Sequence, residues 1–365
     1  MTRPKILVTG ATGKTGHAVV TDLLRRQWPV RAVVHARDAR SEALDRQGVE
    51  TVVADLYDPE QLLAAMRGTE RAYYLTPFQP LMIQSAVAFA VAAREAKLEA
   101  IVGLSQWLAS PSHPSILTRQ TWLVDKLFSM LPGIAHVTIN PGYFADNYLR
   151  FIDFAAHLGI LPNLTGDSRN APPANEDIAR VAVAALIDPD KHAGRCYRPT
   201  GPALLSSRDM AEILSRVLNR TIRSVTMPWW LLTRAARLQG VHPFDLYNLR
   251  YYTEDHLQGA FAFGVPTDDV YEVTGQPPEP FEVTARRYAA LPKANRTIGN
   301  TMRAWANFLR TPFAPGYDLD RFERAQGFPA APDAKLAMRN ERWKAERALQ
   351  AAQWKSPPTV SGAAA

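Results

Sequence analysis

The chain has 365 residues, of which 47% are hydrophobic and 21% are charged, a composition typical of a folded globular protein. This composition excludes a collagen-like, coiled-coil or disordered chain. The 42 basic and 35 acidic residues give a formal charge of +7, and because they are intermixed they favour a small anionic ligand over nucleic acid. The single cysteine, Cys196, excludes an internal disulfide and a cysteine-based zinc site.

Nothing in the sequence predicts a targeting segment or a membrane span. The first residues enter a short apolar run without a longer hydrophobic signal region. The longest apolar stretch, about residues 82–93, is followed by Arg94 and Glu95 and is shorter than the roughly 20 residues that a span needs. We therefore expect a soluble cytoplasmic protein without membrane association.

The first part of the chain alternates short β-branched runs with helical patterns. This order is typical of a parallel sheet built from strand–helix–strand units. Between the first two runs, Val19, Val20, Leu23 and Leu24 recur at helical spacing and form one apolar face. The expected strands cover residues 5–9, 30–34, 50–54, 71–75, 100–104 and 135–139. They predict an α/β fold with a doubly wound parallel sheet of the Rossmann type.

The pattern changes after about residue 143. Helices are expected at residues 175–186 and 206–218, the second with Ser206 or Ser207 as its N-cap, and a strand-like run at residues 195–199. These segments are expected to complete the sheet and cover its carboxyl edge. For residues 333–355 we expect a helix that is solvated or packs on the protein, and the alternative is a helix that binds a partner or nucleic acid. For residues 356–365 we expect a mobile tail.

Three parts are thus expected. Residues 1–142 are expected to form the core of this sheet, residues 143–292 a smaller lobe that completes it, and residues 293–365 a helical appendage with its mobile tail.

The most informative segment is Val8-Thr-Gly-Ala-Thr-Gly-Lys-Thr-Gly16, between the first expected strand and the first helix. Its glycines Gly10, Gly13 and Gly16 allow a tight turn, close approach of the backbone to a pyrophosphate, and close packing of helix on strand. The helix N-terminus that follows presents free N–H groups to phosphate. The segment predicts a dinucleotide site rather than a purely structural turn, so residues 1–142 are the expected cofactor-binding core and residues 143–292 the expected substrate-binding lobe.

The same segment resembles the extended and atypical short-chain dehydrogenase/reductase superfamily, in particular its NmrA-like branch, which includes isoflavone-reductase-like and quinone-reductase-like enzymes. Segments after the third to sixth strands share the resemblance, which covers roughly residues 4–290 and leaves the appendage unexplained. It implies a set of cofactor contacts, namely Gly10, Thr12, Gly13, Lys14, Thr15, Gly16, His35, Arg37, Asp55, Leu56, Thr76, Pro77, Phe78, Pro141, Gly142, Tyr143 and Phe144.

The end of the second strand bears on the choice between NAD and NADP. An acidic side chain there would bond the ribose 2′-hydroxyl, whereas an arginine accommodates a 2′-phosphate. This region contains three potential cations, His35, Arg37 and Lys14, and one acidic residue, Asp38. Asp38 could instead be the N-cap of the following helix. We therefore expect NADP(H), with NAD(H) as the alternative.

The usual catalytic pair of the superfamily, Tyr-x-x-x-Lys, is missing, because no tyrosine occurs between Tyr74 and Tyr143. This departure puts ordinary alcohol dehydrogenation in doubt but leaves hydride transfer open, since the cofactor carries the hard step. Candidate proton donors or polarising groups are Lys126, Tyr143, Ser105, His113 and His136, each with an ordinary structural interpretation. The eight dispersed histidines predict no metal site.

Aromatic and polar residues fall in the segments expected to border the nicotinamide. They predict an apolar pocket for a planar substrate, with core packing as the alternative. The candidates are Trp107, Trp122, Asn147, Trp229 and Trp230.

The sequence thus predicts an NADPH-dependent oxidoreductase that transfers hydride to an apolar, aromatic or conjugated small molecule such as a quinone, enone or imine. The alternative is a non-catalytic redox sensor of the NmrA type, which binds NADP(H) and signals to a protein partner. A homo-oligomer is left open, and nucleic-acid binding is not expected.

Overall fold

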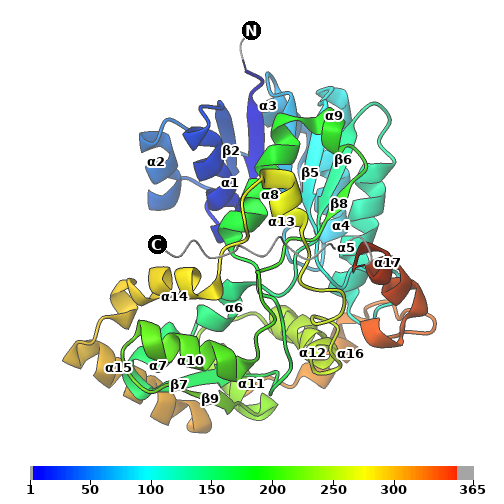
Figure 1. Ribbon diagram of the computed structural model, residues 1–365. Coiled ribbons are helices and arrows are strands. Elements are labelled where there is room, and N and C mark those ends of the chain that lie inside the picture. The colour runs from blue at the N-terminus through cyan, green and yellow to red at the C-terminus, as the bar shows by residue number, and fades with distance from the viewer. Residues whose placement is uncertain (1–2, 352–365) are drawn as a thin grey trace, which may run out of the picture.

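The computed structural model describes residues 3–351, and the tail expected over residues 356–365 lies outside the described residues. A seven-stranded parallel sheet, in the order β3-β2-β1-β4-β5-β6-β8, forms the upper half of the molecule in Figure 1. Its strands are β1 (Ile6–Thr9), β2 (Val30–Val34), β3 (Glu50–Val53), β4 (Arg71–Leu75), β5 (Ala100–Leu104), β6 (Ala135–Ile139) and β8 (Cys196–Tyr197). The predicted doubly wound α/β fold is confirmed, and each of the six predicted strands occurs with its ends correct to one residue.

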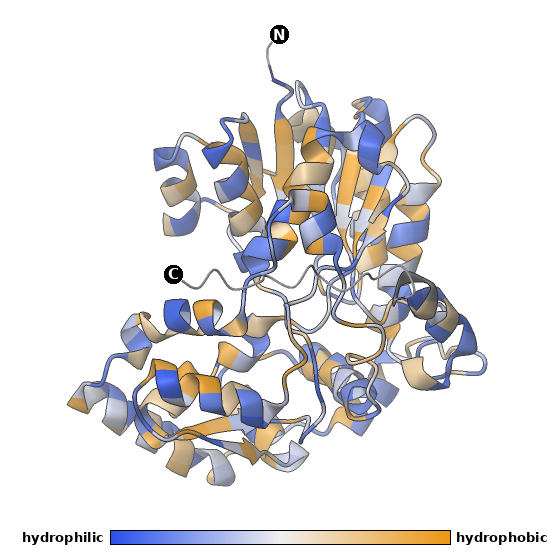
Figure 2. Cartoon of the chain, in the orientation of Figure 1, coloured by the Kyte–Doolittle hydropathy of each residue, from blue (hydrophilic) through white to orange (hydrophobic). Residues whose placement is uncertain are grey.

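Helices cover both faces of this sheet, as a parallel sheet requires. One face carries α1 (Lys14–Arg25), α2 (Ala39–Arg46) and α8 (Asn175–Ile187), with α13 (Asp269–Thr274) packed on α8. The other face carries α3 (Pro59–Met66), α4 (Met82–Glu95) and α5 (Ile116–Ser129), and α9 (Pro189–His192) leads into β8. Figure 2 shows apolar strands between helices whose outer sides are polar.

The apolar face of α1 packs against the sheet and α8, as its sequence pattern predicts. Val19 and Leu23 are fully buried and meet Ile178 of α8 in one core cluster, whereas Phe89 and Phe128 anchor the core on the opposite face. The order of strands reverses between β1 and β4. In a doubly wound sheet a crevice opens at the carboxyl ends of the strands at such a reversal, which is where these folds bind ligands.

A second, smaller lobe lies at the carboxyl ends of the large sheet. Its two parallel strands, β7 (Ile160–Asn163) and β9 (Arg223–Thr226), pack with α7 (Ile152–Leu158), α10 (Ser207–Val217), α14 (Phe281–Ala289) and α15 (Ile298–Arg310). Leu161, Leu214 and Phe281 are buried at its centre. The Ser206 hydroxyl accepts a hydrogen bond from Asp209 N–H, so Ser206 rather than Ser207 is the N-cap of α10.

The remaining helices are α6 (Ala145–Leu149), α11 (Trp229–Leu238), α12 (Pro243–Leu257), α16 (Leu319–Gln326) and α17 (Glu341–Ala351), with 3₁₀ turns at Pro292–Ala294, Thr311–Phe313 and Ala337–Arg339. The helix predicted from residue 333 begins only at Glu341. It packs on the protein, because Trp343 is 1% exposed and its indole N–H donates to the carbonyl oxygen of Trp107. α17 thereby covers the end of β5.

Candidate functional site

The glycine loop between β1 and α1 has the shape that a pyrophosphate requires. Gly10 has φ of +65°, a left-handed conformation that favours glycine. A Cβ atom added at Gly16 would lie 2.2 Å from the carbonyl oxygen of Gly10, so a side chain there would collide with the turn. Gly13 is the N-cap of α1, and no side chain caps the first N–H groups of that helix. These groups are therefore free to face an anion.

Residues beside the glycines hold the loop against both lobes. The Thr15 hydroxyl donates to the Asn175 side chain at the start of α8 at 2.8 Å, and Thr12 is half-buried. The Lys14 ammonium lies 2.8 Å from the Asp146 carboxylate of α6 and 2.6 Å from the Tyr288 hydroxyl of α14. The lysine expected to face a phosphate therefore bridges the glycine loop and the smaller lobe.

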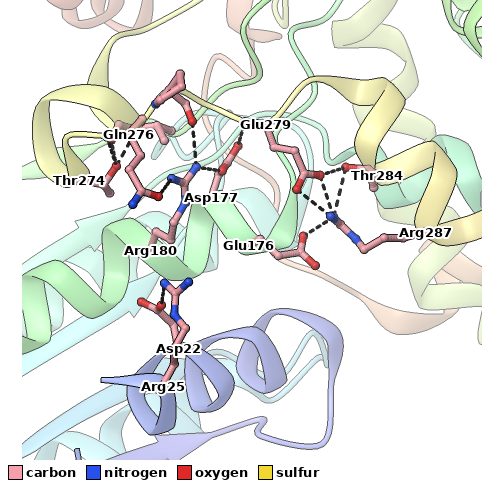
Figure 3. A network of polar contacts seen from close by, with 12 residues as sticks. Asp22, Arg25, Glu176, Asp177, Arg180, Thr274, Gln276, Glu279, Thr284 and Arg287 are labelled. Atoms are coloured by element: carbon pink, nitrogen blue, oxygen red, sulfur yellow. Dashed lines mark hydrogen bonds and ion pairs between the residues drawn. The ribbon is translucent and has the colours of Figure 1, made fainter. Parts of the chain in front are cut away.

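A network of charged groups extends this bridge along the start of α8 (Figure 3). Arg287 of α14 pairs with Glu176 at 2.6 Å and with Glu279 at 2.7 Å. The backbone N–H of Glu279 donates to Asp177, which also pairs with Arg180. The smaller lobe is thus tied to the large sheet beside the glycine loop.

The tip of β2 offers fewer free cations than the sequence suggests. The Arg37 guanidinium pairs with Asp45 at 2.5 Å and donates to the Thr51 carbonyl. Asp38 is the N-cap of α2, and hydrogen bonds from that helix lower the pKa of its carboxyl. Of the two interpretations of Asp38, the N-cap is the one that the structure contains. His35 is exposed, and the described residues give it no hydrogen bond.

The ends of β3 and β4 border the same crevice. Asp55 accepts a hydrogen bond from the Tyr57 N–H, and Leu56 packs on the adjacent core. Thr76 is 3% exposed, yet its hydroxyl has no hydrogen-bond partner among the described residues. Pro77 is half-buried, and Phe78 is 51% exposed. A buried hydroxyl without a partner at the strand reversal is consistent with a ligand contact.

Beyond β5 and β6 lies an aromatic pocket of about 50 Å³. Tyr143 and Asn147, both candidates from the sequence, border it together with residues that the sequence analysis did not single out. These are Tyr148, Arg150, Phe151, Pro162, Asn163, Leu164, Thr165, Leu232, Leu249, Tyr252, Thr253 and His256. Tyr252 and His256 are four residues apart on α12 and share a face of that helix, but the sequence does not reveal that this face reaches the sheet.

Hydrogen bonds fix the aromatic side chains around this pocket. The Asn170 amide donates to the Tyr143 carbonyl at 2.6 Å, and the Tyr148 hydroxyl lies 2.8 Å from His256 Nε2. The Tyr252 hydroxyl donates to Gln106, which directly follows Ser105 at the end of β5. Burial raises the pKa of Tyr143 and lowers that of His256 to about 4. At neutral pH both side chains are therefore uncharged.

Helix α6 connects the pocket to the glycine loop. Its Asp146 contacts Lys14, whereas Asn147 and Tyr148 of the same helix line the pocket. The segment before it is also fixed, because the Pro141 carbonyl accepts from Trp107 N–H and Gly142 lies against Asn170. Phe144, the N-cap of α6, packs against the core of the large sheet.

The other predicted site residues lie apart from this pocket. The Ser105 hydroxyl donates to Asp125 of α5 at 2.6 Å, and burial raises the pKa of that carboxyl to about 7. Trp122 and Lys126 line a different cavity, with the Lys126 ammonium 5.6 Å from the Trp122 ring centre.

The remaining tryptophans also lie elsewhere. Trp107 is 1% exposed and belongs to the core. Trp229 packs in a small cluster at the edge of α11, and Trp230 is 54% exposed beside Arg234.

No helix in residues 3–351 is both long and apolar enough to cross a membrane. Within the same part of the chain, no three His, Cys, Asp or Glu side chains gather where they could hold a metal ion.

A doubly wound parallel sheet with this glycine loop defines a dinucleotide-binding protein of the short-chain dehydrogenase/reductase type. The model of the NmrA-like family matches residues 2–105. The chain is 31% identical over 291 residues to the NAD(P)H azoreductase of Xenophilus azovorans, covering 78% of this chain and 98% of that one. The chain belongs to the NmrA-like family.

Two solved structures share the fold. One is the NADPH-dependent quinone oxidoreductase of Escherichia coli complexed with NADPH, with a TM-score of 0.65, 22% identity, and coverage of 77% of this chain and 99% of that one. The other is NmrA, a negative transcriptional regulator, in complex with NADP, with a TM-score of 0.66, 18% identity, and coverage of 82% and 99%. The resemblance stated from the sequence is confirmed.

Proposed function

We propose that the protein is an NADPH-dependent oxidoreductase that reduces a planar, conjugated small molecule in the aromatic pocket at Tyr143. The observation that carries this proposal is the connection made by α6, which contacts the glycine loop through Asp146 and the pocket through Asn147 and Tyr148. A cofactor held by the loop would therefore end beside the pocket. The azoreductase and quinone oxidoreductase among the relatives support the same class of reaction.

The glycine loop fits a dinucleotide. Its cradle has no room for a side chain at Gly16, and the uncapped N–H groups of α1 would hold the pyrophosphate. Asp38 caps α2 and is not available for a ribose 2′-hydroxyl, which supports NADP(H) over NAD(H). The exposed His35 and the nearby Arg37 remain the candidates for binding the 2′-phosphate of NADP(H). When bound, the reduced cofactor supplies the hydride.

The pocket would hold the acceptor by aromatic contact. Tyr143 packs edge-on against Tyr148 and His256, so its ring is fixed in orientation. With about 50 Å³ of space, the pocket is too narrow for a planar substrate as it stands. Phe151 and the exposed Arg150 at its border would have to turn outwards on binding.

Tyr143 would orient and polarise the acceptor. Since its pKa is raised rather than lowered, its hydroxyl stays protonated and donates a hydrogen bond to a carbonyl, azo or imine group. It differs in this respect from the usual tyrosine of the superfamily, which a nearby lysine makes more acidic. Lys126 and Ser105 are less suited, because Lys126 lines another cavity and Ser105 is bonded to Asp125.

A redox sensor is the second candidate. The absence of a lysine among the pocket residues favours it, because Arg150, a cation of the pocket that lowers the pKa of Tyr143, has a smaller effect than the rise that burial causes. The fold shared with the regulator NmrA agrees with it. A sensor would bind NADP(H) in the same glycine loop but leave the cofactor unchanged.

The two candidates are separated by following NADPH absorbance with purified protein and a panel of quinones, azo dyes, enones and imines. Binding is first established by quenching of tryptophan fluorescence. Loss of NADPH that depends on one acceptor class supports the oxidoreductase and identifies the substrate class. NADPH that binds tightly but persists with every acceptor supports the sensor, and failure to bind contradicts both.

A further inference from the structure

A second cavity, of about 440 Å³, lies at the open edge of the large sheet, between α5, β6, β8 and α17. It shares no lining residue with the aromatic pocket. Four basic side chains and two acidic ones face it, namely Lys126, Arg195, Arg198, Arg347, Asp125 and Glu346. The excess of positive charge in a cavity of this size calls for an explanation that hydride transfer does not provide.

Arg198 is the most unusual of these residues. It follows β8 and is 3% exposed, yet its Nε and Nη1 atoms have no hydrogen-bond partner, and no ion pair in the described residues includes it. Its guanidinium lies over the Trp107 ring, 4.8 Å from the ring centre. The nearby Asp269 carboxylate accepts from the backbone N–H of Arg198 rather than from its side chain. A buried guanidinium without a counter-ion costs several kcal/mol.

Arg347 of α17 adds a second buried cation to the same wall. It is 3% exposed, donates to the Trp107 carbonyl at 2.7 Å and pairs with Glu346 at 2.9 Å, but its Nε has no partner. Repulsion from Arg198 and burial lower the pKa of Arg347 to about 9. The two arginines therefore face one cavity with unused N–H donors. Among the described residues, the only carboxylate paired with them is that of Glu346, which pairs with Arg347.

Other polar atoms of this wall are also unpaired. Asn140 Oδ1 and His136 Nε2 line the cavity without a hydrogen-bond partner among the described residues. Burial lowers the pKa of His136 to about 4, so its ring is neutral at pH 7 and adds no charge. Buried polar atoms in native proteins are nearly always satisfied, so four residues with unpaired atoms in one cavity point to a missing polar ligand.

We propose that this cavity binds a small organic anion, a carboxylate or a phosphate ester, whose charged group pairs with Arg198 and Arg347 and whose apolar part lies along Trp122. Guanidinium groups match the geometry of both kinds of oxyanion. The volume exceeds that of an inorganic ion and falls in the range of small-molecule sites. The half-buried Trp122 ring supplies the apolar wall.

Titration calorimetry with inorganic phosphate, benzoate and benzamide tests the proposal. NADP⁺ is present in excess so that phosphate does not enter the glycine loop. If NADP⁺ itself fails to bind, the proposed cofactor site fails, while the benzoate titration still tests the cavity. We expect benzoate or phosphate to bind and the neutral benzamide to bind at least about tenfold more weakly. Tighter binding of benzoate identifies a carboxylate ligand, and tighter binding of phosphate identifies a phosphate ester.

Three variants locate the binding. Arg198→Met keeps most of the side-chain volume and should weaken anion binding at least about tenfold. Arg195→Gln changes an exposed residue of the same cavity, so it should fold normally and weaken binding several-fold. Arg208→Gln removes an exposed positive charge from α10, outside the cavity, and should have no effect.

Three results would overturn the proposal. The wild-type protein could bind neither anion, it could bind benzamide as tightly as benzoate, or both Arg198→Met and Arg195→Gln could retain full affinity. If Arg198→Met does not fold, Arg195→Gln alone decides.

Discussion

The aromatic pocket and the cavity at Arg198 both border the core around Trp107, and they differ in chemistry. The aromatic pocket is narrow, and several of its polar side chains are hydrogen-bonded, as Tyr148 is to His256, although His256 Nδ1 and Thr165 Oγ1 lack partners. The cavity at Arg198 is wide and leaves two buried cations with unused donors. A narrow hollow lined mainly by aromatic and apolar side chains suits an apolar ligand, whereas buried cations with unpaired donors mark a site for an anion.

Replacing Trp107 tests the core that both hollows border and has the largest expected effect. Because this side chain is fully buried and contacts Arg198 and Trp343, Trp107→Ala should lower the free energy of unfolding by about 3–5 kcal/mol. Chemical denaturation measures this change. Trp230→Ala is the matched control, since Trp230 is 54% exposed and should change the free energy by less than about 0.5 kcal/mol. Equal effects of the two substitutions would show that Trp107 does not anchor this core.

The glycine loop should matter for the aromatic pocket but not for the cavity at Arg198. Gly16→Ala places a methyl group against the Gly10 carbonyl, and we expect NADPH affinity to fall about 100-fold, as measured by tryptophan fluorescence. Benzoate binding should be unchanged. The control is Gly299→Ala in α15, where an added methyl meets no atom within 4 Å. Retained NADPH affinity in Gly16→Ala would contradict the position of the cofactor.

Tyr143→Phe removes only the hydroxyl that we assign to the acceptor. Loss of one polarising hydrogen bond should lower kcat about tenfold or more, while the affinity for NADPH and for benzoate stays unchanged. Tyr271→Phe, at a side chain that is 51% exposed on α13, is the control. If Tyr143→Phe kept full kcat with every reducible acceptor, another group would have to polarise the substrate.

Asp125, which lines the cavity at Arg198, should make the free energy of unfolding of the protein depend on pH. Its pKa in the folded protein, about 7, lies above the ordinary 3.8 because burial outweighs the opposing effects of Ser105, Lys126 and Arg347. The folded state therefore holds the extra proton, and the free energy of unfolding should fall as the pH rises from about 4 to about 7. Since the side chain is partly exposed, we expect a contribution of only about 1 kcal/mol.

Asp125→Asn removes this titration. Thermal unfolding at intervals across that pH range should give a flatter profile for the variant than for the wild-type protein. Parallel profiles would mean that Asp125 titrates as an ordinary carboxyl.

The parts of the fold that depend on local pattern could be predicted from the sequence. The β-branched runs predicted the six strands to within a residue, and the apolar face of Val19 and Leu23 predicted that a helix follows β1, because period and turn chemistry are local. The glycine spacing likewise predicted the loop, since only glycine tolerates the turn at Gly10 and the contact at Gly16.

The composition of the two hollows depends on tertiary contacts and could not be predicted. Trp107 and Trp122 look alike as site residues, but α17 returns from the end of the described chain to bury the first, whereas the second borders the cavity at Arg198. Lys14 has the position of a phosphate ligand, yet Asp146 and Tyr288, distant in sequence, engage it. Tyr252 and His256 reach the aromatic pocket only because α12 packs beneath the sheet.

The most direct test of the proposed reaction is a single-turnover experiment with NADPH that carries deuterium at C4 of the nicotinamide, mixed with the acceptor class that the panel identifies. We predict that deuterium leaves the cofactor at the rate at which NADPH absorbance is lost, that it appears in the product where the acceptor takes the hydride at carbon, and that Tyr143→Phe slows the loss of absorbance and of label equally. Bound NADPH that keeps its label in the presence of every acceptor would contradict the account and leave the redox sensor as the function of the site.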